Sequence, residues 1–416
     1  MGVHLTPPVT RRCYNMKVDI ISKDKINPAS PTPLLLRRYQ LSILDQIVRH
    51  FYVPWVLFYL NNNKNTTPIN FSPIKSNYLK HTLSETLTHY YPFAGKVKDD
   101  LNYIDCNDEG VYYVEAKVSY SLKEFRCQPD MQLIQLLTPN NPQTLESMSR
   151  NYVILVQVNI FYCGGIAIGT CASHKIADAA TFSTFMNAWS RVAACGSLEV
   201  VQNPSFTAPS LFPPNASVLC KWPFKASGKN ESMTRRFVFD GAALAALRAQ
   251  AASIPHVRYP TSVEAVGALI WGCVIEAISK HMPHAKVEFP CMVDCIRKAI
   301  AKVDNDFIES IKGNEGYAKV KESLKEYAEL LHNIDEDNFL IFSSLRKAGI
   351  YEVDFGWGKP TWCYFCNPSL KSAVVLMDTR SGDGIEAIVR LNGQAMAIFE
   401  RDQKLLLFAS DDPSPL

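Results

Sequence analysis

Polar and apolar positions of the chain follow two periodicities. The first is an alternation of polar and apolar residues, and it predicts β-strands. Residues 151–173 carry no charged side chain, and an uncharged run of this length is also long enough to span a bilayer. Gln157 and Asn159, however, alternate with valine and isoleucine, and the pair Gly164–Gly165 interrupts the run. We therefore predict two buried strands around a turn in this stretch, and no transmembrane helix. Further strands are predicted at 55–59, 111–118, 237–239, 374–377 and 385–391.

The second periodicity, near 3.6 residues, predicts helices. Four large apolar residues at i, i+3, i+4 and i+7 form one helix face, namely Phe182, Phe185, Met186 and Trp189. Asp178 precedes this face at the position of an N-cap or a first-turn carboxylate. Further helices are predicted at 74–90, 241–252, 263–280, 305–333 with a break near 313–316, and 393–407.

The composition changes between two halves that each mix helices and strands. Residues 196–234 are rich in proline, serine and asparagine, which is typical of a long surface linker. We therefore predict two domains, at 16–195 and 235–416, joined by this linker. A chain of 416 residues has room for both domains. The mixture of helices and strands in both halves predicts an α/β fold class.

The charge balance excludes two classes of protein. Hydrophobic residues make up 47% of the chain and charged residues 20%, so extensive disorder is excluded. A net charge of +3 argues against a dedicated nucleic-acid-binding protein, but it permits a weakly basic groove for an anionic ligand. The twelve cysteines are scattered and no apolar signal segment opens the chain, so we expect free thiols in a reducing compartment.

The strongest candidate for chemistry is the segment Ser173–Asp178, where a predicted strand meets a predicted helix. Histidine side chains can accept a proton near neutral pH, and a junction between packed elements can hold such a side chain rigidly in a cleft. His174 is therefore a candidate general base. Asp178, four residues later, would orient the imidazole or cap the helix. The alternative from the pattern alone is a packed histidine followed by an ordinary N-cap.

A second candidate is the glycine-rich turn Asp354-Phe-Gly-Trp-Gly358, which Pro360 closely follows. Two glycines around a tryptophan impose an irregular backbone, and the proline ends it. Asp-Phe-Gly also occurs in protein kinases, but the chain has no Gly-x-Gly-x-x-Gly, Val-Ala-Ile-Lys or His-Arg-Asp segment, so a kinase is excluded. The simpler interpretation is a structural turn with a packed Trp357.

Two pairs of residues have the spacing of metal ligands, Cys363 with Cys366 and His281 with His284. The two pairs lie far apart in the sequence, and no second Cys-x-x-Cys accompanies the first. If 361–366 is a strand, its two cysteines also point to opposite faces. We therefore predict no metal site.

Together these motifs resemble those of the plant BAHD acyl-CoA-dependent acyltransferases. The resemblance rests first on His174-x-x-x-Asp178 combined with the later Asp354-Phe-Gly-Trp-Gly358. The segments Cys163–Gly165 and Ser173–Asp178 are most similar to the vinorine synthase-like branch. Further matching segments, between Val18 and Phe408, are Leu41–Gln46, Tyr91–Gly95, Asp105–Gly110, Arg236–Asp240 and Gly384–Ala387.

The resemblance implies a fold of two similar mixed-sheet domains, like that of chloramphenicol acetyltransferase, with a long crossover and a channel between them. It implies that acyl-CoA is a co-substrate, with acetyl-CoA as the expected donor, and that no cofactor is bound permanently. The acceptor would be a hydroxyl group of a plant specialised metabolite such as an alkaloid. The protein would be a cytoplasmic monomer with no nucleic-acid or membrane partner.

The resemblance also gives roles to the residues of both motifs. His174 would take the proton of the attacking alcohol, and Asp178 would hold the loop. Asp354 belongs by resemblance to the same catalytic set. The residues that would shape the CoA-binding channel are Gly356, Trp357 and Gly358.

One departure from the family leads to a second hypothesis. In the family, a segment with an Asn/Asp-x-Arg motif follows the strand that would here be 287–294, whereas this chain continues directly from Asp294 to Cys295. About thirty residues would then be missing, among them the arginine that pairs with Asp178 in the family. We do not expect the nearby Arg297 to replace it. The alternative to an active acyltransferase is therefore a catalytically impaired or non-enzymatic homologue.

Overall fold

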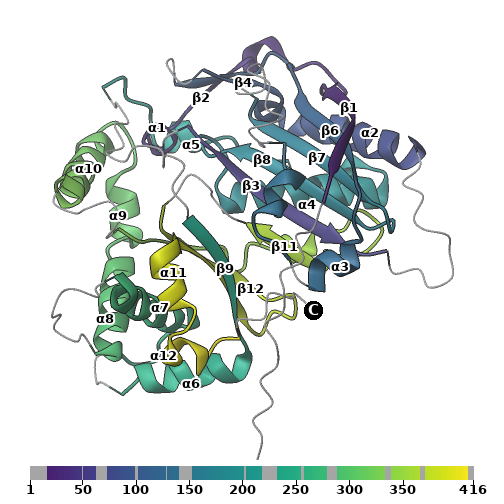
Figure 1. The fold of residues 1–416 in the computed structure, drawn as a ribbon. Coiled ribbons are helices and arrows are strands. Elements are labelled where there is room, and N and C mark those ends of the chain that lie inside the picture. Colours follow the sequence, from purple (N-terminus) through teal and green to yellow (C-terminus); the bar gives the residue numbers. More distant parts are fainter. Residues whose placement is uncertain are drawn as a thin grey trace, which may run out of the picture.

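Two sheet-containing units lie beside each other in the computed structural model of the chain (Figure 1). Their strands form a six-stranded, a four-stranded and a three-stranded sheet. The residues that the structure describes are 16–48, 50–61, 73–98, 102–127, 129–139, 152–200, 203–217, 232–253, 257–278, 288–332, 339–365 and 371–410.

The six-stranded sheet has the strand order β1-β6-β7-β8-β3-β11. Its β6–β7 pair is parallel, and its other pairs are antiparallel. The strand predicted at 111–118 and the two strands predicted within 151–173 are confirmed, whereas the strand predicted at 55–59 begins earlier. The bounds are β1 Val18–Ile26, β3 Tyr52–Tyr59, β6 Val111–Val118, β7 Ile154–Phe161, β8 Ile166–Ser173 and β11 Trp362–Phe365.

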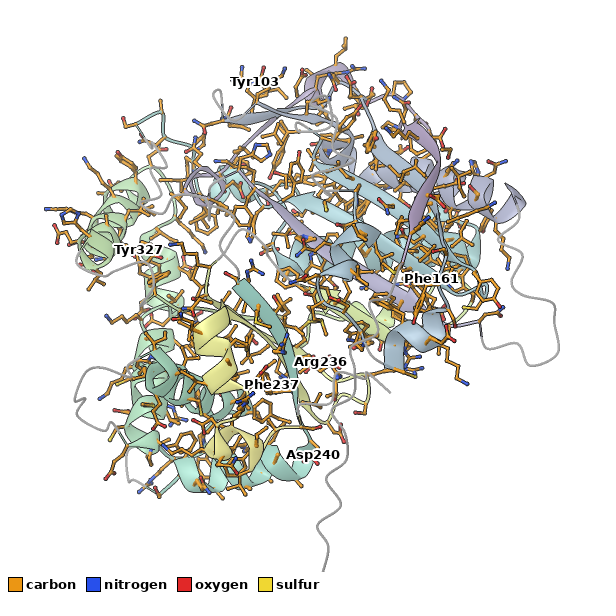
Figure 2. All side chains as sticks on the ribbon, viewed as in Figure 1. Tyr103, Phe161, Arg236, Phe237, Asp240 and Tyr327 are labelled. Atoms are coloured by element: carbon orange, nitrogen blue, oxygen red, sulfur yellow. The ribbon has the colours of Figure 1, made fainter. Side chains whose placement is uncertain are left out.

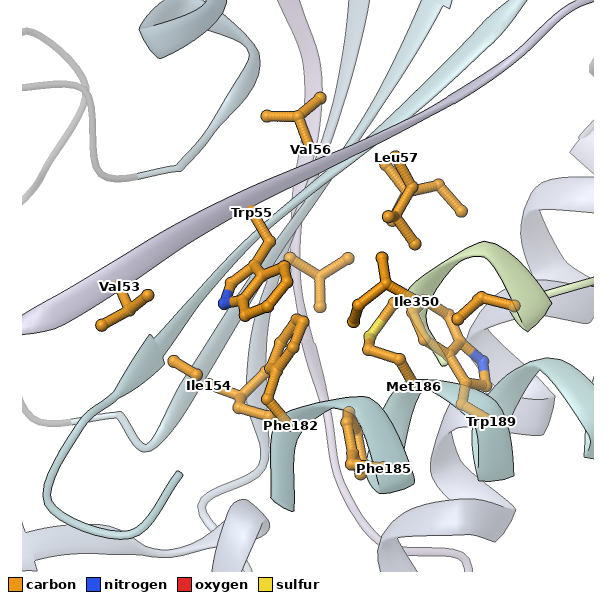
Figure 3. Close-up of a cluster of buried hydrophobic side chains, with 14 of the residues drawn as sticks. Val53, Trp55, Val56, Leu57, Ile154, Phe182, Phe185, Met186, Trp189 and Ile350 are labelled. Atoms are coloured by element: carbon orange, nitrogen blue, oxygen red, sulfur yellow. The ribbon is translucent and has the colours of Figure 1, made fainter. Parts of the chain in front are cut away.

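On one face of this sheet, α2 (Pro73–His89) packs beside α4 (Ala179–Cys195). The apolar stripe predicted for α4 is confirmed, because its large side chains are buried against the sheet. Trp55 of β3 stacks on Phe182 of α4 with 4.8 Å between the ring centroids (Figure 3). Asp178 is the N-cap of α4, as predicted, so the helix that follows the His174 loop is held firmly on the sheet.

On the opposite face, the 3-10 helix η4 (Leu133–Leu137) lies directly on the sheet. Gly169 of β8 permits this close approach, because an added Cβ would lie 1.8 Å from the carbonyl oxygen of Leu137. The side-chain amides of Asn159 and Gln157 donate hydrogen bonds to carbonyl oxygens of η4, at 2.8 and 3.0 Å. The two polar residues that interrupt the apolar pattern of β7 therefore fix a neighbouring segment.

Strand β11 comes from the stretch 235–416 that we predict as the second domain, yet it pairs with β3 at the edge of the first sheet. Cys363 lies opposite Leu57 in this antiparallel pair. The stretch 235–416 thus contributes one strand to the first sheet, which chain order does not reveal. The described part of the predicted linker contains α5 (Ala208–Leu211).

The four-stranded sheet has the order β10-β12-β13-β9, with a parallel β10–β12 pair. Its strands confirm those predicted at 237–239, 374–377 and 385–391. Side chains of successive residues point to opposite faces, so Phe237 packs among the helices while Arg236 faces the other way (Figure 2). The bounds are β9 Ser232–Phe239, β10 Ile341–Ser344, β12 Ala373–Asp378 and β13 Ile385–Asn392.

The helices of this unit correct two sequence-based predictions. The strand predicted over 287–294 is wrong, because α8 (Phe289–Ala301) begins there and packs on α7 with its apolar side. The single helix predicted over 393–407 is also wrong, because Asp402 caps a new short helix by accepting from two backbone N–H groups. The neighbouring helices are α6 Gly241–Ala251, α7 Ser262–Ile278, α11 Gly393–Phe399 and α12 Gln403–Leu406.

The break predicted near 313–316 is confirmed, since α9 (Asn305–Ser310) ends before α10 (Gly316–His332) begins. The helices predicted at 74–90, 241–252 and 263–280 correspond to α2, α6 and α7. Among the described residues, no helix combines the length and the apolarity needed to cross a membrane. The remaining elements are β2 Arg38–Gln40, β4 Lys96–Lys98, β5 Tyr103–Asp105, α1 Ile43–Gln46, α3 Leu122–Cys127, η1 Leu34–Leu36, η2 Tyr91–Ala94, η6 Leu198–Val200 and η8 Ile350–Glu352.

Candidate active site

His174 lies at the predicted junction, directly after β8 and before α4. Its backbone N–H donates to the carbonyl oxygen of Phe51 at 2.9 Å, which ties the loop to the residue before β3. The Phe51 ring also lies against the imidazole, with 4.9 Å between the ring centroids. Two backbone N–H groups of the loop, those of Ile176 and Ala177, donate back to Ser173. The loop is thus a compact turn that fixes the histidine.

The two ring nitrogens of His174 lie in different surroundings. The side chain is half-buried, and its Nδ1 is buried without a hydrogen-bond partner among the described residues. Nε2 is not among the buried side-chain atoms that lack a partner, so the two nitrogens differ in their surroundings. A neutral imidazole that accepts a proton at Nε2 carries its own proton at Nδ1. The arrangement therefore suits a general base that acts through Nε2.

Lys175 holds the loop from inside the protein. Lys175 is buried, and its ammonium group donates to the carbonyl oxygen of Gln46 at 3.3 Å. The Gln46 side chain in turn accepts from the backbone N–H of Asn215 in the crossover, at 2.9 Å. Burial raises the pKa of the neighbouring Asp45 carboxyl, while hydrogen bonds from Ser42 and the Lys175 charge act against this rise. Lys175 and Gln46 both belong to segments matched by resemblance, but no sequence pattern assigns a role to either residue.

Asp178 does not contact the imidazole through any hydrogen bond of the described residues. Its Oδ1 accepts from the backbone N–H of Thr181 at 2.8 Å, and the residue is exposed. Arg297 pairs instead with Glu264 through two contacts of 3.0 and 2.9 Å, as expected for a residue that does not replace the family's arginine. Because Asp178 is exposed, the loss of a partner leaves no buried unpaired charge.

Replacing Asp178 by alanine removes this cap, so we expect the free energy of unfolding to fall by about 1 kcal/mol. Asp178→Asn keeps a capping oxygen and should leave the stability nearly unchanged. Urea denaturation of both variants measures the difference. If the asparagine variant were as unstable as the alanine variant, the negative charge and not the cap would be what the loop requires.

The Asp354–Gly358 loop is closed by its own first residue. Asp354 Oδ1 accepts from the backbone N–H groups of Gly356 and Gly358, at 2.8 and 2.9 Å. Both glycines have positive φ angles, +89° and +106°, which residues with a Cβ rarely adopt. Trp357 stacks on Phe355 inside the loop, with 5.4 Å between the ring centroids. The conformation therefore requires this aspartate and these glycines, as expected for a structural turn.

The structure does not bring Asp354 and His174 together. Phe355 lies against Trp189 in the second half of α4, at 4.8 Å between ring centroids, and the loop continues past Ala194. His174 precedes the first turn of the same helix, and a rise of 1.5 Å per residue puts Ala194 about 22 Å from the helix start. The loop is thus packed against the far end of α4, away from His174.

The candidate metal ligands are only partly described. Cys363 is buried in β11, where burial raises the pKa of its thiol well above the usual value. Cys366, His281 and His284 lie outside the described residues. No group of three or more His, Cys, Asp or Glu side chains suited to a metal ion occurs within the described part of the chain.

Curated relatives of the chain are plant acetyltransferases. A limonoid 7-O-acetyltransferase of Citrus sinensis is 36% identical over 462 residues, covering 96% of this chain and 100% of that protein. Salutaridinol 7-O-acetyltransferase of Papaver somniferum is 32% identical over 467 residues, covering 93% of this chain and 97% of that protein.

Solved structures share the fold. The crystal structure of vinorine synthase superposes with a TM-score of 0.78 at 29% identity, covering 96% of this chain and 100% of that chain. TRI101 of F. sporotrichioides, crystallised with coenzyme A and T-2, gives a TM-score of 0.67 at 14% identity over 90% of this chain and 99% of that chain. The predicted fold of two mixed-sheet domains is confirmed.

A family model described as the Transferase family matches residues 16–314 and 286–406, so its two matches overlap at 286–314. The alignment with the Citrus enzyme is longer than the 416 residues of this chain, so that enzyme carries residues that this chain lacks. The family match is thus interrupted near α8, in the region where the sequence departs from the family. Matches over nearly the whole chain, relatives above 30% identity and a shared fold lead to one conclusion: the chain belongs to the BAHD acyl-CoA-dependent acyltransferases, in the vinorine synthase-like branch.

Proposed function

We propose that the chain transfers an acetyl group from acetyl-CoA to a hydroxyl group of a plant specialised metabolite, with His174 as the general base. The observation that carries this proposal is the half-buried His174, whose Nδ1 is enclosed and whose loop is held by contacts with Phe51 and Lys175. Acetyltransferases among the relatives and the coenzyme A complexes of structural neighbours support the donor.

The proposed reaction needs no covalent intermediate with the enzyme. His174 Nε2 takes the proton of the acceptor hydroxyl while its oxygen attacks the thioester carbonyl carbon. The resulting tetrahedral oxyanion collapses, the carbon–sulfur bond breaks, and CoA leaves as a thiolate that takes up the proton from the imidazolium. A positioned base of this kind contributes about 10²- to 10⁴-fold to the rate. The products are the acetyl ester and free CoA.

The other motif residues are proposed to support this base from a distance. Asp178 fixes the start of α4, and Asp354 fixes the loop at the end of the same helix. We propose that Gly356, Trp357 and Gly358 shape the CoA-binding channel by setting the position of this helix and of Tyr59, whose hydroxyl group donates to the carbonyl oxygen of Val353 at 3.0 Å.

The names of the relatives favour a plant specialised metabolite as the acceptor. One relative is named for limonoids, another for salutaridinol, and a third is akuammiline synthase 2 of Alstonia scholaris, at 31% identity. We therefore propose that a hydroxylated terpenoid or alkaloid is the acceptor. We also propose a monomeric, cytoplasmic enzyme.

A catalytically impaired homologue is the second candidate, and the interrupted family match at 286–314 is the observation that favours it. Edge strand β10 is also largely exposed, and Phe342 keeps 39% of its surface in water. An intact and braced His174 loop favours the active enzyme. The two candidates differ in whether the folded chain still binds its donor.

Titration calorimetry of acetyl-CoA into the full chain distinguishes these candidates without knowledge of the acceptor. We expect micromolar binding with one site per chain if the enzyme is active. A folded chain, judged by circular dichroism, that binds neither acetyl-CoA nor malonyl-CoA nor benzoyl-CoA would identify it as the impaired homologue.

A further inference from the structure

Three consecutive leucines project into water at the surface of the first unit. They form the 3-10 helix η1, and Leu34, Leu35 and Leu36 are 86%, 97% and 41% exposed. Leu35 is the most exposed large hydrophobic side chain of the described residues. Single exposed apolar side chains are common on soluble proteins, but a contiguous group of them marks an interaction site.

Polar contacts on both sides fix the position of the leucine turn, so it is not a loose loop. Thr32, on one side of them, is buried and donates from its hydroxyl group to Asp108 Oδ1 at 2.5 Å. Arg37, on the other side, forms an ion pair of 3.0 Å with Asp108 and donates to the carbonyl oxygen of Thr32 at 3.1 Å. Both ends of η1 are therefore tied to one carboxylate, and the apolar projection is pre-organised.

The surface next to the leucines is basic. The stretch 27–40 contains no acidic residue, and because its Arg37 is paired with Asp108, Arg38 is the arginine that contributes to the charge beside the turn. Arg38 begins β2, and its guanidinium lies 4.3 Å from the centroid of the Tyr103 ring, at the edge of the molecule (Figure 2). Lys98 pairs with Tyr103 across the same three-stranded sheet and points to the same face. Asp105, the one carboxylate of these three strands, lies opposite Arg38 and Lys96, so the strands carry three cationic side chains against one carboxylate.

We propose that the Leu34–Leu36 turn docks the protein on an anionic lipid bilayer. The leucines would enter the boundary between headgroups and acyl chains, while Arg38 and Lys98 would contact lipid phosphates. Apolar insertion combined with cationic contacts is how peripheral proteins bind membranes reversibly. The charge around the turn suits an anionic surface better than an apolar protein groove. This proposal departs from the absence of a membrane partner expected from the family resemblance.

Co-sedimentation of the full chain with vesicles tests the proposal. We expect binding to vesicles of phosphatidylcholine with phosphatidylserine, and weaker binding to phosphatidylcholine alone. The double variant Leu34→Ser/Leu35→Ser should lose about tenfold or more in partition coefficient, because two inserted side chains are removed. Arg38→Gln should weaken binding only to the anionic vesicles. Leu407→Ser is the matched control, since Leu407 is 72% exposed beside α12 at the other end of the molecule (Figure 1).

Two results would overturn the proposal. One is a wild-type chain that stays in the supernatant with both kinds of vesicle, and the other is an equal loss of binding in the Leu407→Ser control. Size-exclusion chromatography tests whether the turn instead binds a second copy of the chain. A larger species that only the double variant abolishes would assign the turn to self-association and would refute lipid docking. Unchanged thermal unfolding of each variant shows that it is folded.

Discussion

His174→Ala should lower the rate of acetyl transfer by about 10²- to 10⁴-fold, the usual contribution of a positioned general base. The same variant should remain folded, because the imidazole is half-buried and its ring contacts only Phe51 among the described aromatic side chains. Binding of acetyl-CoA should also survive, since the proposed role of His174 is toward the acceptor hydroxyl. The loss should therefore appear in kcat and not in the dissociation constant of the donor.

Steady-state release of the CoA thiol, followed with a thiol reagent, measures this effect. His81→Ala is a suitable control, because His81 is an exposed histidine of α2 that pairs with Glu85 at 3.5 Å, one helical turn away. It should keep the wild-type rate. Ester formation by His174→Ala at a rate within a few-fold of wild type would contradict the proposed mechanism, whatever the acceptor.

Arg236→Met should be the most destabilising of the variants considered. Arg236 and Glu386 form an ion pair of 2.7 Å between β9 and β13, and both side chains are only 4% exposed. Removal of the guanidinium leaves the Glu386 carboxylate buried without its partner, so we expect a loss of about 3–5 kcal/mol in the free energy of unfolding. Denaturant titration of the full chain measures this loss.

The adjacent pair provides a matched control. Arg235 forms an ion pair of 2.9 Å with Glu400, and these side chains are 31% and 29% exposed. Water screens such a pair, so Arg235→Met should cost about 1 kcal/mol or less. The double variant Arg236→Met/Glu386→Met removes both buried charges and should recover much of the stability. Equal losses for the two single variants would show that burial does not decide the strength of these pairs.

Local patterns in the sequence were enough to predict the elements that carry the candidate base. The alternation of Gln157 and Asn159 with apolar residues predicts β7, and the glycine pair that follows separates it from β8. The residue spacing after Asp178 predicts α4 with its cap. Each of these signals acts within a few residues. The position of His174 between strand and helix therefore follows from the sequence alone.

Contacts between distant segments could not be predicted in this way. The pairing of β11 with β3 joins residues about 300 positions apart, and no local pattern in either segment indicates which strand it pairs with. The hydrogen bond from Lys175 to Gln46 also joins residues far apart in the sequence, so it could not be predicted either. The helix α8 was missed for a different reason. The family resemblance placed a strand over residues whose own apolar spacing suits a helix packed on α7.

The most direct test of the central claim is a transfer assay with the full wild-type chain, acetyl-CoA and a panel of hydroxylated terpenoids and alkaloids. Thiol release gives the rate, and mass spectrometry identifies the product. The account predicts thiol release that depends on one or more of the alcohols, with an equal amount of product carrying one added acetyl group. A folded chain that binds no acyl-CoA and forms no ester with any alcohol would contradict it.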